Sequence, residues 1–212
     1  MRLILLLFFI FLQSSSVTPT SSVSYVTTPN SYDNHENITL FSNKDTIGIL
    51  KIPGINYEDY VVQTNNNTFY LNHDYNKKES IYGNAFLDYR VKLDNRQLNI
   101  YHHHFQNNNL GFASILKYQD KSFAVNNKDI FLETKNETLH YEVFASSFIA
   151  KTNNEHMQVL FGTTAEFITH LDKLTTNALY KLSTLDNIKQ VLILQTCAYQ
   201  NGNFFLLLAK RV

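Results

Sequence analysis

The sequence predicts a β-dominated domain with a few short helices. From about residue 46, short apolar segments separated by turn residues recur along the chain. Two continuous apolar runs, residues 191–194 and 204–209, are typical of strands that are buried on both faces. Only two segments have helical spacing, and no internal repeat is present, so we expect the strands to surround one core.

Short apolar segments predict the first four strands: residues 47–52, 60–62, 85–87 and 98–101. The first of these ends at Pro53-Gly54, a pair that favours a turn. Over residues 139–146 apolar and polar side chains alternate, which indicates a half-buried strand.

A capping box predicts the longer of the two helices. Thr163 is followed three residues later by Glu166, so each side chain can bond the backbone N–H of the other. Phe167, Leu171 and Leu174 then follow at helical spacing and indicate one apolar face. A second helix is expected at residues 112–118.

The N-terminal part of the chain predicts export. Arg2 precedes an apolar run over residues 3–12, which is short compared with the roughly 20 residues of a membrane-spanning helix. We therefore expect residues 1–22 to be a signal peptide or a signal anchor, which would tether the protein to the membrane. Residues 23–45 have the composition of a Ser/Thr/Asn-rich linker, and residues 46–212 form the folded domain. The folded part is then extracytoplasmic.

Cys197 is the one cysteine of the 212 residues, and it stands where the apolar run 191–194 gives way to polar residues. A free cysteine is often a small buried hydrophobe. It is a nucleophile where a neighbouring base or positive charge favours the thiolate. The local sequence leaves both interpretations open.

Three consecutive histidines, at positions 102, 103 and 104, follow the strand predicted at residues 98–101. His102 and His104 could bind a metal with a third ligand such as His73, His140 or His156, although this spacing is a weak zinc motif. A single histidine beside Cys197 would instead serve as its proton acceptor. Solvated loop histidines are the third interpretation.

The order and spacing of several segments resemble the sortase family, most closely class B. These segments are residues 47–54, 60–63, 70–74, 86–90, 100–104, 112–118, 141–145 and 166–174. The resemblance closes with Leu194-Gln195-Thr196-Cys197, which is similar to the family's Thr-Leu-x-Thr-Cys signature, and with Ala209-Lys210. It covers about residues 46–212.

The resemblance implies a closed eight-stranded β-barrel and a cysteine transpeptidase without a cofactor. Cys197 would attack the threonine carbonyl of a sorting signal of the Asn-Pro-x-Thr type. His103 would be the acid/base partner, because Tyr101-His102-His103 falls on the family's Tyr-Gly-His run. Thr196, His102 and His104 would then lie beside the substrate.

The chain departs from the family where an arginine is expected, early in the strand after the cysteine. Alignment on Gly202 puts Asn203 at this position, and alignment on Ala209-Lys210 puts Phe204 there. Asn203 could donate a neutral hydrogen bond to an oxyanion, but it supplies no full charge. Arg211 lies roughly 23 Å along the strand from Phe204.

Three hypotheses follow for the function. In the first, the protein is an active transpeptidase in which Asn203, or an arginine from elsewhere such as Arg96, replaces the missing group. In the second, it is a sortase-like protein that binds a peptide or partner with little catalysis. In the third, the histidine cluster of a surface domain binds metal.

The expected partners follow from the resemblance and from the charge. The chain has 18 basic and 18 acidic residues, so its net charge gives no indication of nucleic-acid binding. A transpeptidase of this family would bind the sorting-signal peptide of a surface protein, and a peptidoglycan or pilin amine would accept the acyl group. We expect a monomer on the surface of a Gram-positive cell.

Overall fold

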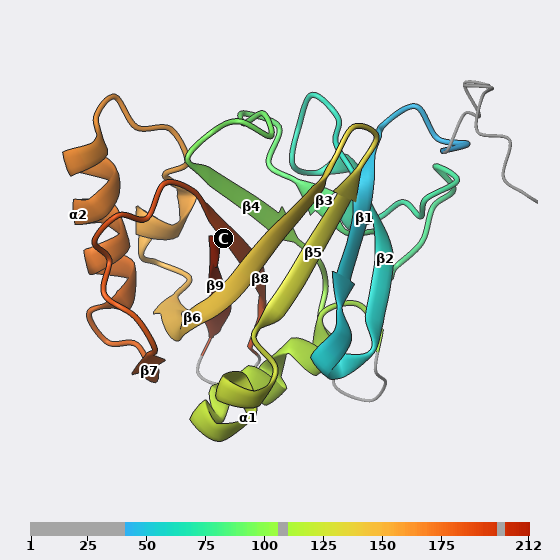
Figure 1. Ribbon diagram of the computed structural model, residues 1–212. Helices are drawn as coiled ribbons and strands as arrows, with labels where there is room; N and C mark the ends of the chain where they lie inside the picture. The colour runs from blue at the N-terminus through green and yellow to red at the C-terminus, as the bar shows by residue number, and fades with distance from the viewer. Residues whose placement is uncertain (1–40, 106–109, 199–201) are drawn as a thin grey trace, which may run out of the picture. The chain divides into compact units, whose positions relative to one another are not determined.

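Eight strands close into a β-barrel in the computed structural model, as the resemblance implied (Figure 1). The structure describes residues 41–105, 110–198 and 202–212, so the expected signal segment 1–22 and most of the linker 23–45 lie outside the described residues. The strands are β1 (Thr46–Ile52), β2 (Tyr57–Val62), β3 (Phe86–Leu87), β4 (Gln97–Tyr101), β5 (Asp129–Thr134), β6 (Thr138–Ala150), β7 (Tyr180–Lys181), β8 (Val191–Cys197) and β9 (Asn203–Arg211).

The sheet runs in the order β5-β1-β2-β3-β4-β8-β9-β6, and pairing of β5 with β6 closes the ring. The short strand β7 adds to β6 outside this ring. Most neighbours are antiparallel, but β2 is parallel to β3, and β4 is parallel to β8. The carboxyl ends of β4 and β8 therefore lie at the same edge of the barrel.

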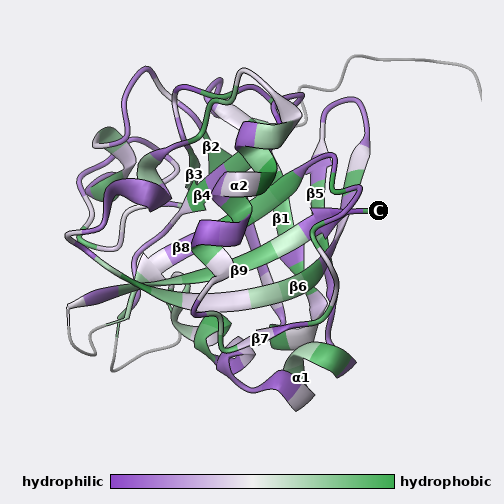
Figure 2. Ribbon diagram, turned by 90° about the vertical axis from the view of Figure 1, so that its left-hand side faces the viewer, coloured by the Kyte–Doolittle hydropathy of each residue, from purple (hydrophilic) through white to green (hydrophobic). Residues whose placement is uncertain are grey.

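Two apolar clusters lie on the two faces of β8, which explains its continuous apolar sequence. Leu192 and Leu194 face the barrel interior, where they pack in the main core. Val191 and Ile193 face outward against α2 (Thr164–Thr175). Figure 2 shows α2 lying across the outer side of the barrel, near β9.

The helix expected after Thr163 is confirmed, and both hydrogen bonds of the capping box are present. The helix expected at residues 112–118 is instead a 3-10 helix, Ala113–Gln119. Its buried residues, Ile115 and Tyr118, are three positions apart, and side chains at this spacing lie on one face of a 3-10 helix. A short helix, α1 (Lys121–Asn126), follows, capped by Asp120.

We expect the barrel core to be the main source of stability. Leu207 is fully buried in the main core, so Leu207→Ala should lower the free energy of unfolding by about 2–5 kcal/mol in urea denaturation. Leu160, which is 53% exposed, is the matched control. Leu160→Ala should change the free energy of unfolding by less than about 0.5 kcal/mol. Equal losses in both variants would contradict this assignment of the core.

Candidate functional site

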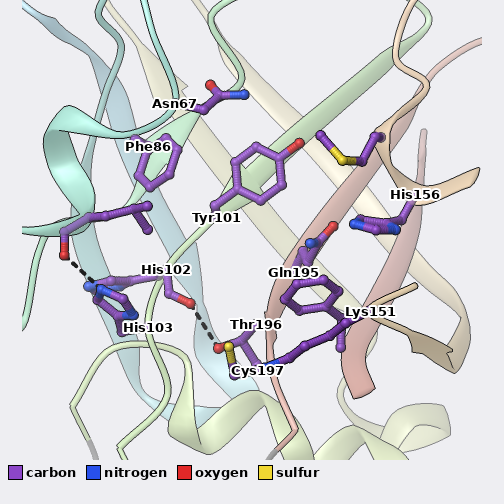
Figure 3. Close-up of a pocket in the computed structure, with 13 residues that line it drawn as sticks. Asn67, Phe86, Tyr101, His102, His103, Lys151, His156, Gln195, Thr196 and Cys197 are labelled. Atoms are coloured by element: carbon purple, nitrogen blue, oxygen red, sulfur yellow. Dashed lines mark hydrogen bonds between the residues drawn. The ribbon is translucent and has the colours of Figure 1, made fainter. Parts of the chain in front are cut away.

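A pocket of about 450 Å³ opens at the carboxyl ends of β4 and β8, and Cys197 and His103 both line it (Figure 3). The other lining residues are Asn67, Leu71, Phe86, Tyr101, His102, Lys151, His156, Met157, Gln195, Thr196 and Phe204. The walls are mainly aromatic and aliphatic, which suits a pocket that binds an apolar part of a ligand.

The parallel pairing of β4 with β8 brings the histidines to the cysteine. Tyr101 lies opposite Gln195 in this ladder, and the pairing continues beyond it because the His102 N–H donates to Gln195 O at 3.3 Å. The Thr196 hydroxyl then donates to His102 O at 2.8 Å. The chain segments that carry His103 and Cys197 are therefore fixed against each other.

The backbone next to the Cys197 thiol is also held in place. The thiol is free and partly exposed at the end of β8. His104 Nδ1 donates to Cys197 O at 2.8 Å, and the Ala198 N–H donates to Asn203 O at 3.0 Å. His104 thus contacts the cysteine backbone and does not line the pocket.

His103 is oriented by a hydrogen bond from its ring to the main chain. Its Nε2 lies 2.7 Å from Leu71 O, and a carbonyl oxygen can only accept, so Nε2 carries a proton. The ring also contacts Phe105 edge to face. Exchange of a proton with a reacting group in the pocket would therefore fall to Nδ1.

His102 has a different environment from His103, although both line the pocket. Its ring packs against Phe112 in the barrel interior, and its Nδ1 shares a hydrogen bond of 3.2 Å with the Tyr57 hydroxyl. Burial, together with the nearby charge of His103, lowers the pKa of His102 to about 3. The ring is therefore neutral near pH 7.

The buried carboxylate of Asp88 supports the floor of the pocket. It accepts hydrogen bonds from the Tyr101 hydroxyl at 2.9 Å and from Asn67 Nδ2 at 2.9 Å. Arg90 binds the same carboxylate through two nitrogens, at 2.9 and 2.7 Å. Burial raises the pKa of Asp88, but these hydrogen bonds outweigh it and lower the pKa overall. Both guanidinium nitrogens of this contact are engaged with Asp88, so Arg90 has a structural role in the floor of the pocket.

Phe204 lies opposite Cys197 across β8 and β9, and it lines the pocket. Asn203 pairs with Ala150 and is not a lining residue; side chains alternate along a strand, so its side chain is expected on the other face of β9. In the part of the chain that the structure describes, no arginine lines the pocket. Arg211, at the far end of β9, binds Glu137 at 3.0 Å.

Arg96 and His140, two other positions considered from the sequence, lie apart from the cysteine. Arg96 directly precedes β4, so the whole strand, roughly 16 Å, separates it from the pocket. His140 binds Asp129 near the start of β6. Within residues 41–105, 110–198 and 202–212, no three His, Cys, Asp or Glu side chains are placed to hold a metal ion.

The segment that follows β6 supplies pocket residues that sequence reasoning did not place beside Cys197; His156 had been considered only as a metal ligand. Lys151 follows the last residue of β6, and His156 and Met157 come from the short 3-10 helix Asn154–Met157. No local motif marks these residues, because their position depends on the pairing of β6 with β9. The apolar side chain of Met157 is the only feature of this segment in the sequence that suits a pocket wall.

Two curated proteins are similar to this chain in sequence. Sortase B of Listeria monocytogenes is 30% identical over 162 residues, and sortase B of Staphylococcus aureus is 27% identical over 158 residues. Each match covers 73% of this chain, which spans 63% and 64% of the length of these relatives. No protein-family model matches the sequence.

Solved structures of sortase B share the fold. Clostridium perfringens sortase B superposes with a TM-score of 0.74 and 26% identity, over 80% of this chain and 95% of its own. A Staphylococcus aureus sortase B–substrate complex has a TM-score of 0.71 and 25% identity, over 80% of this chain and 81% of its own. The similarity in sequence and the similarity in fold lead to the same family.

The buried state of His102 predicts a pH dependence of stability. The pKa of an unfolded histidine is about 6.5, so between that value and about 3 the unfolded chain binds more protons than the folded one. The free energy of unfolding should therefore fall as the pH falls from about 6.5. In urea denaturation at several pH values, His102→Asn should reduce this slope. Burial also lowers the pKa of His156 and that of His170, the latter to about 4, and these two residues should account for the rest. An unchanged slope would contradict a neutral, buried His102.

Proposed function

Because this chain belongs to the sortase family, class B, we propose that it is a cysteine transpeptidase with Cys197 as nucleophile and His103 as acid/base partner. The observation that carries the proposal is that both residues line one pocket, at the joined ends of two parallel strands. A purely binding domain has no chemical need for this pair. The proposed substrate is a sorting signal of the Asn-Pro-x-Thr type.

The proposed reaction has two steps. The Cys197 thiolate attacks the threonine carbonyl carbon, the S–C bond forms, and the carbonyl electron pair moves to oxygen. When that pair returns, the C–N bond breaks and the leaving amine takes a proton from His103. An acceptor amine then attacks the thioester, gives a proton to His103, and the S–C bond breaks to restore the thiolate.

The apolar walls and the fixed backbone support peptide binding. One relative has been solved as a substrate complex, which supports a peptide ligand for this chain too. The side chain of Thr196 and the backbone of His102 are tied together at the base of the pocket, and His104 holds Cys197 O. We retain these three residues as proposed substrate contacts or supports. The role of a neutral donor at Asn203 stays a prediction from the sequence, since Asn203 does not line the pocket.

The proposed function also implies where the protein acts. We propose export through residues 1–22, action as a monomer at a Gram-positive cell surface, and a peptidoglycan or pilin amine as acceptor. Among the described residues, no helix is long and apolar enough to cross a membrane.

A second function is favoured by one observation. Phe204, an uncharged residue, stands opposite Cys197, where a transition state with negative charge on oxygen would benefit from a cation. A protein that binds the signal peptide without cleaving it would tolerate this residue. The two functions differ in whether a covalent bond to Cys197 forms.

Mass spectrometry of the domain incubated with an Asn-Pro-Gln-Thr-type peptide distinguishes them. We expect a thioester adduct on Cys197 that is absent in Cys197→Ala. His103→Ala should slow adduct formation by about 10²–10⁴-fold, since it removes the proton donor and acceptor. The matched control is His140→Ala, because His140 binds Asp129 away from the pocket, and it should react like the wild type. Peptide binding without any adduct in the wild type would favour the binding protein.

A further inference from the structure

The Lys151 side chain brings a positive charge into the pocket beside Phe204. Its Nζ lies 5.3 Å from the centroid of the Phe204 ring, within the range of a cation–π contact. Phe204 is the residue that pairs with Cys197 across β8 and β9. Lys151 lines the same pocket as Cys197 and His103, and Figure 3 shows its side chain extending toward the cysteine.

The strand register holds the Lys151 backbone at this position. Lys151 follows Ala150, the last residue of β6, which lies opposite the first residue of β9. The Lys151 N–H donates to Gly202 O at 3.4 Å and so continues the pairing beyond the end of both strands. The backbone is tied to the strand that faces Cys197, so only the flexible side chain has to be ordered by Phe204.

Among the described residues that line the pocket, Lys151 is the one lysine or arginine. The lining histidines His102 and His156 are buried, and burial lowers the pKa of both. None of the ion pairs between described residues involves Lys151. Its charge is therefore available to a ligand.

We propose that the Lys151 ammonium contacts the acyl carbonyl oxygen of the bound peptide and stabilises the negative charge that develops there. This role rests on the proposed function. When the Cys197 thiolate attacks and the S–C bond forms, the carbonyl electron pair moves to oxygen. A cation beside that oxygen interacts more strongly with the transition state than with the neutral carbonyl. The leaving amine takes its proton from His103, so Lys151 keeps its own proton throughout.

The surroundings of Lys151 make this interaction stronger once the peptide is bound. Lys151 is exposed, so water screens its charge. A peptide in the pocket would displace water from the apolar walls, which include Phe86, Met157 and Phe204, and the attraction between opposite charges rises as the effective dielectric falls. For the neutral amide of Asn203, the interaction with a negatively charged oxygen would strengthen much less.

The rate of adduct formation on Cys197, measured at saturating peptide, tests the role of Lys151. Lys151→Met keeps the length of the side chain but removes the charge, and it should slow acylation about a hundredfold or more with little change in peptide binding. Lys151→Arg should retain most of the rate. In the Lys151→Met background, Phe204→Arg should recover activity, because it supplies a cation directly opposite Cys197. The matched control is Lys135→Met, in the exposed turn before β6, which should react like the wild type.

The rates of these variants distinguish failure of the Lys151 role from failure of the proposed function. A Lys151→Met variant that reacts as fast as the wild type would overturn the role of Lys151 and leave the transpeptidase intact. Loss of rate in Lys151→Arg equal to that in Lys151→Met, without rescue by Phe204→Arg, would show that charge is not the cause. Absence of any adduct in the wild type would overturn both the proposed function and this role. If Lys151→Met does not fold, Lys151→Gln serves in its place.

Discussion

The parallel pairing of β4 with β8 is the constraint on which the site depends. Parallel strands end at the same edge of a sheet, so residues that follow β4 and residues that end β8 meet, although about 95 positions separate them in sequence. The hydrogen bonds from Thr196 to His102 O and from His104 to Cys197 O fasten these two ends together. Burial of β8 on both faces, with Leu192 and Leu194 in the main core and Val191 and Ile193 in the outer cluster, in turn holds the strand in place.

The floor of the pocket depends on a second constraint, the neutralisation of a buried carboxylate. Asp88 could not remain ionised in the barrel wall without the forked contact to Arg90 and the hydrogen bonds from Tyr101 and Asn67. Two of these partners also line the pocket, so the network that satisfies Asp88 also sets the shape of the floor. An arginine committed in this way is not available for catalysis.

Local patterns in the sequence predicted some elements better than others. The capping box at Thr163 and the two-sided apolar run of β8 are complete within a few residues, so both could be read directly. Strand β5 was missed, since its alternation rests on only Ile130 and Leu132, and the segment at 113–119 was taken for an α-helix although its spacing of three residues suits a 3-10 turn. The prediction that Cys197 and His103 share one site came from the family resemblance, and both residues line the pocket. Lys151 could not be predicted, because it reaches the pocket through the register of β6 and β9.

Phe204, and not an arginine, lies opposite Cys197 on β9, so a positive charge near the cysteine has to come from elsewhere. A cation stabilises a transition state with negative charge on oxygen if it lies close to that oxygen, whichever strand carries it. Strands β8, β9 and β6 lie side by side, so the end of β6 is two strand spacings, roughly 10 Å, from the end of β8. A long side chain from β6 has to cross β9 to approach the cysteine, and a bulky charged residue on β9 would obstruct it. Phe204 offers instead an aromatic face that attracts the flexible stem and ammonium of Lys151. Phe204 leaves β9 without a charge opposite Cys197, and it is also the residue whose ring holds the ammonium group of Lys151 beside the pocket.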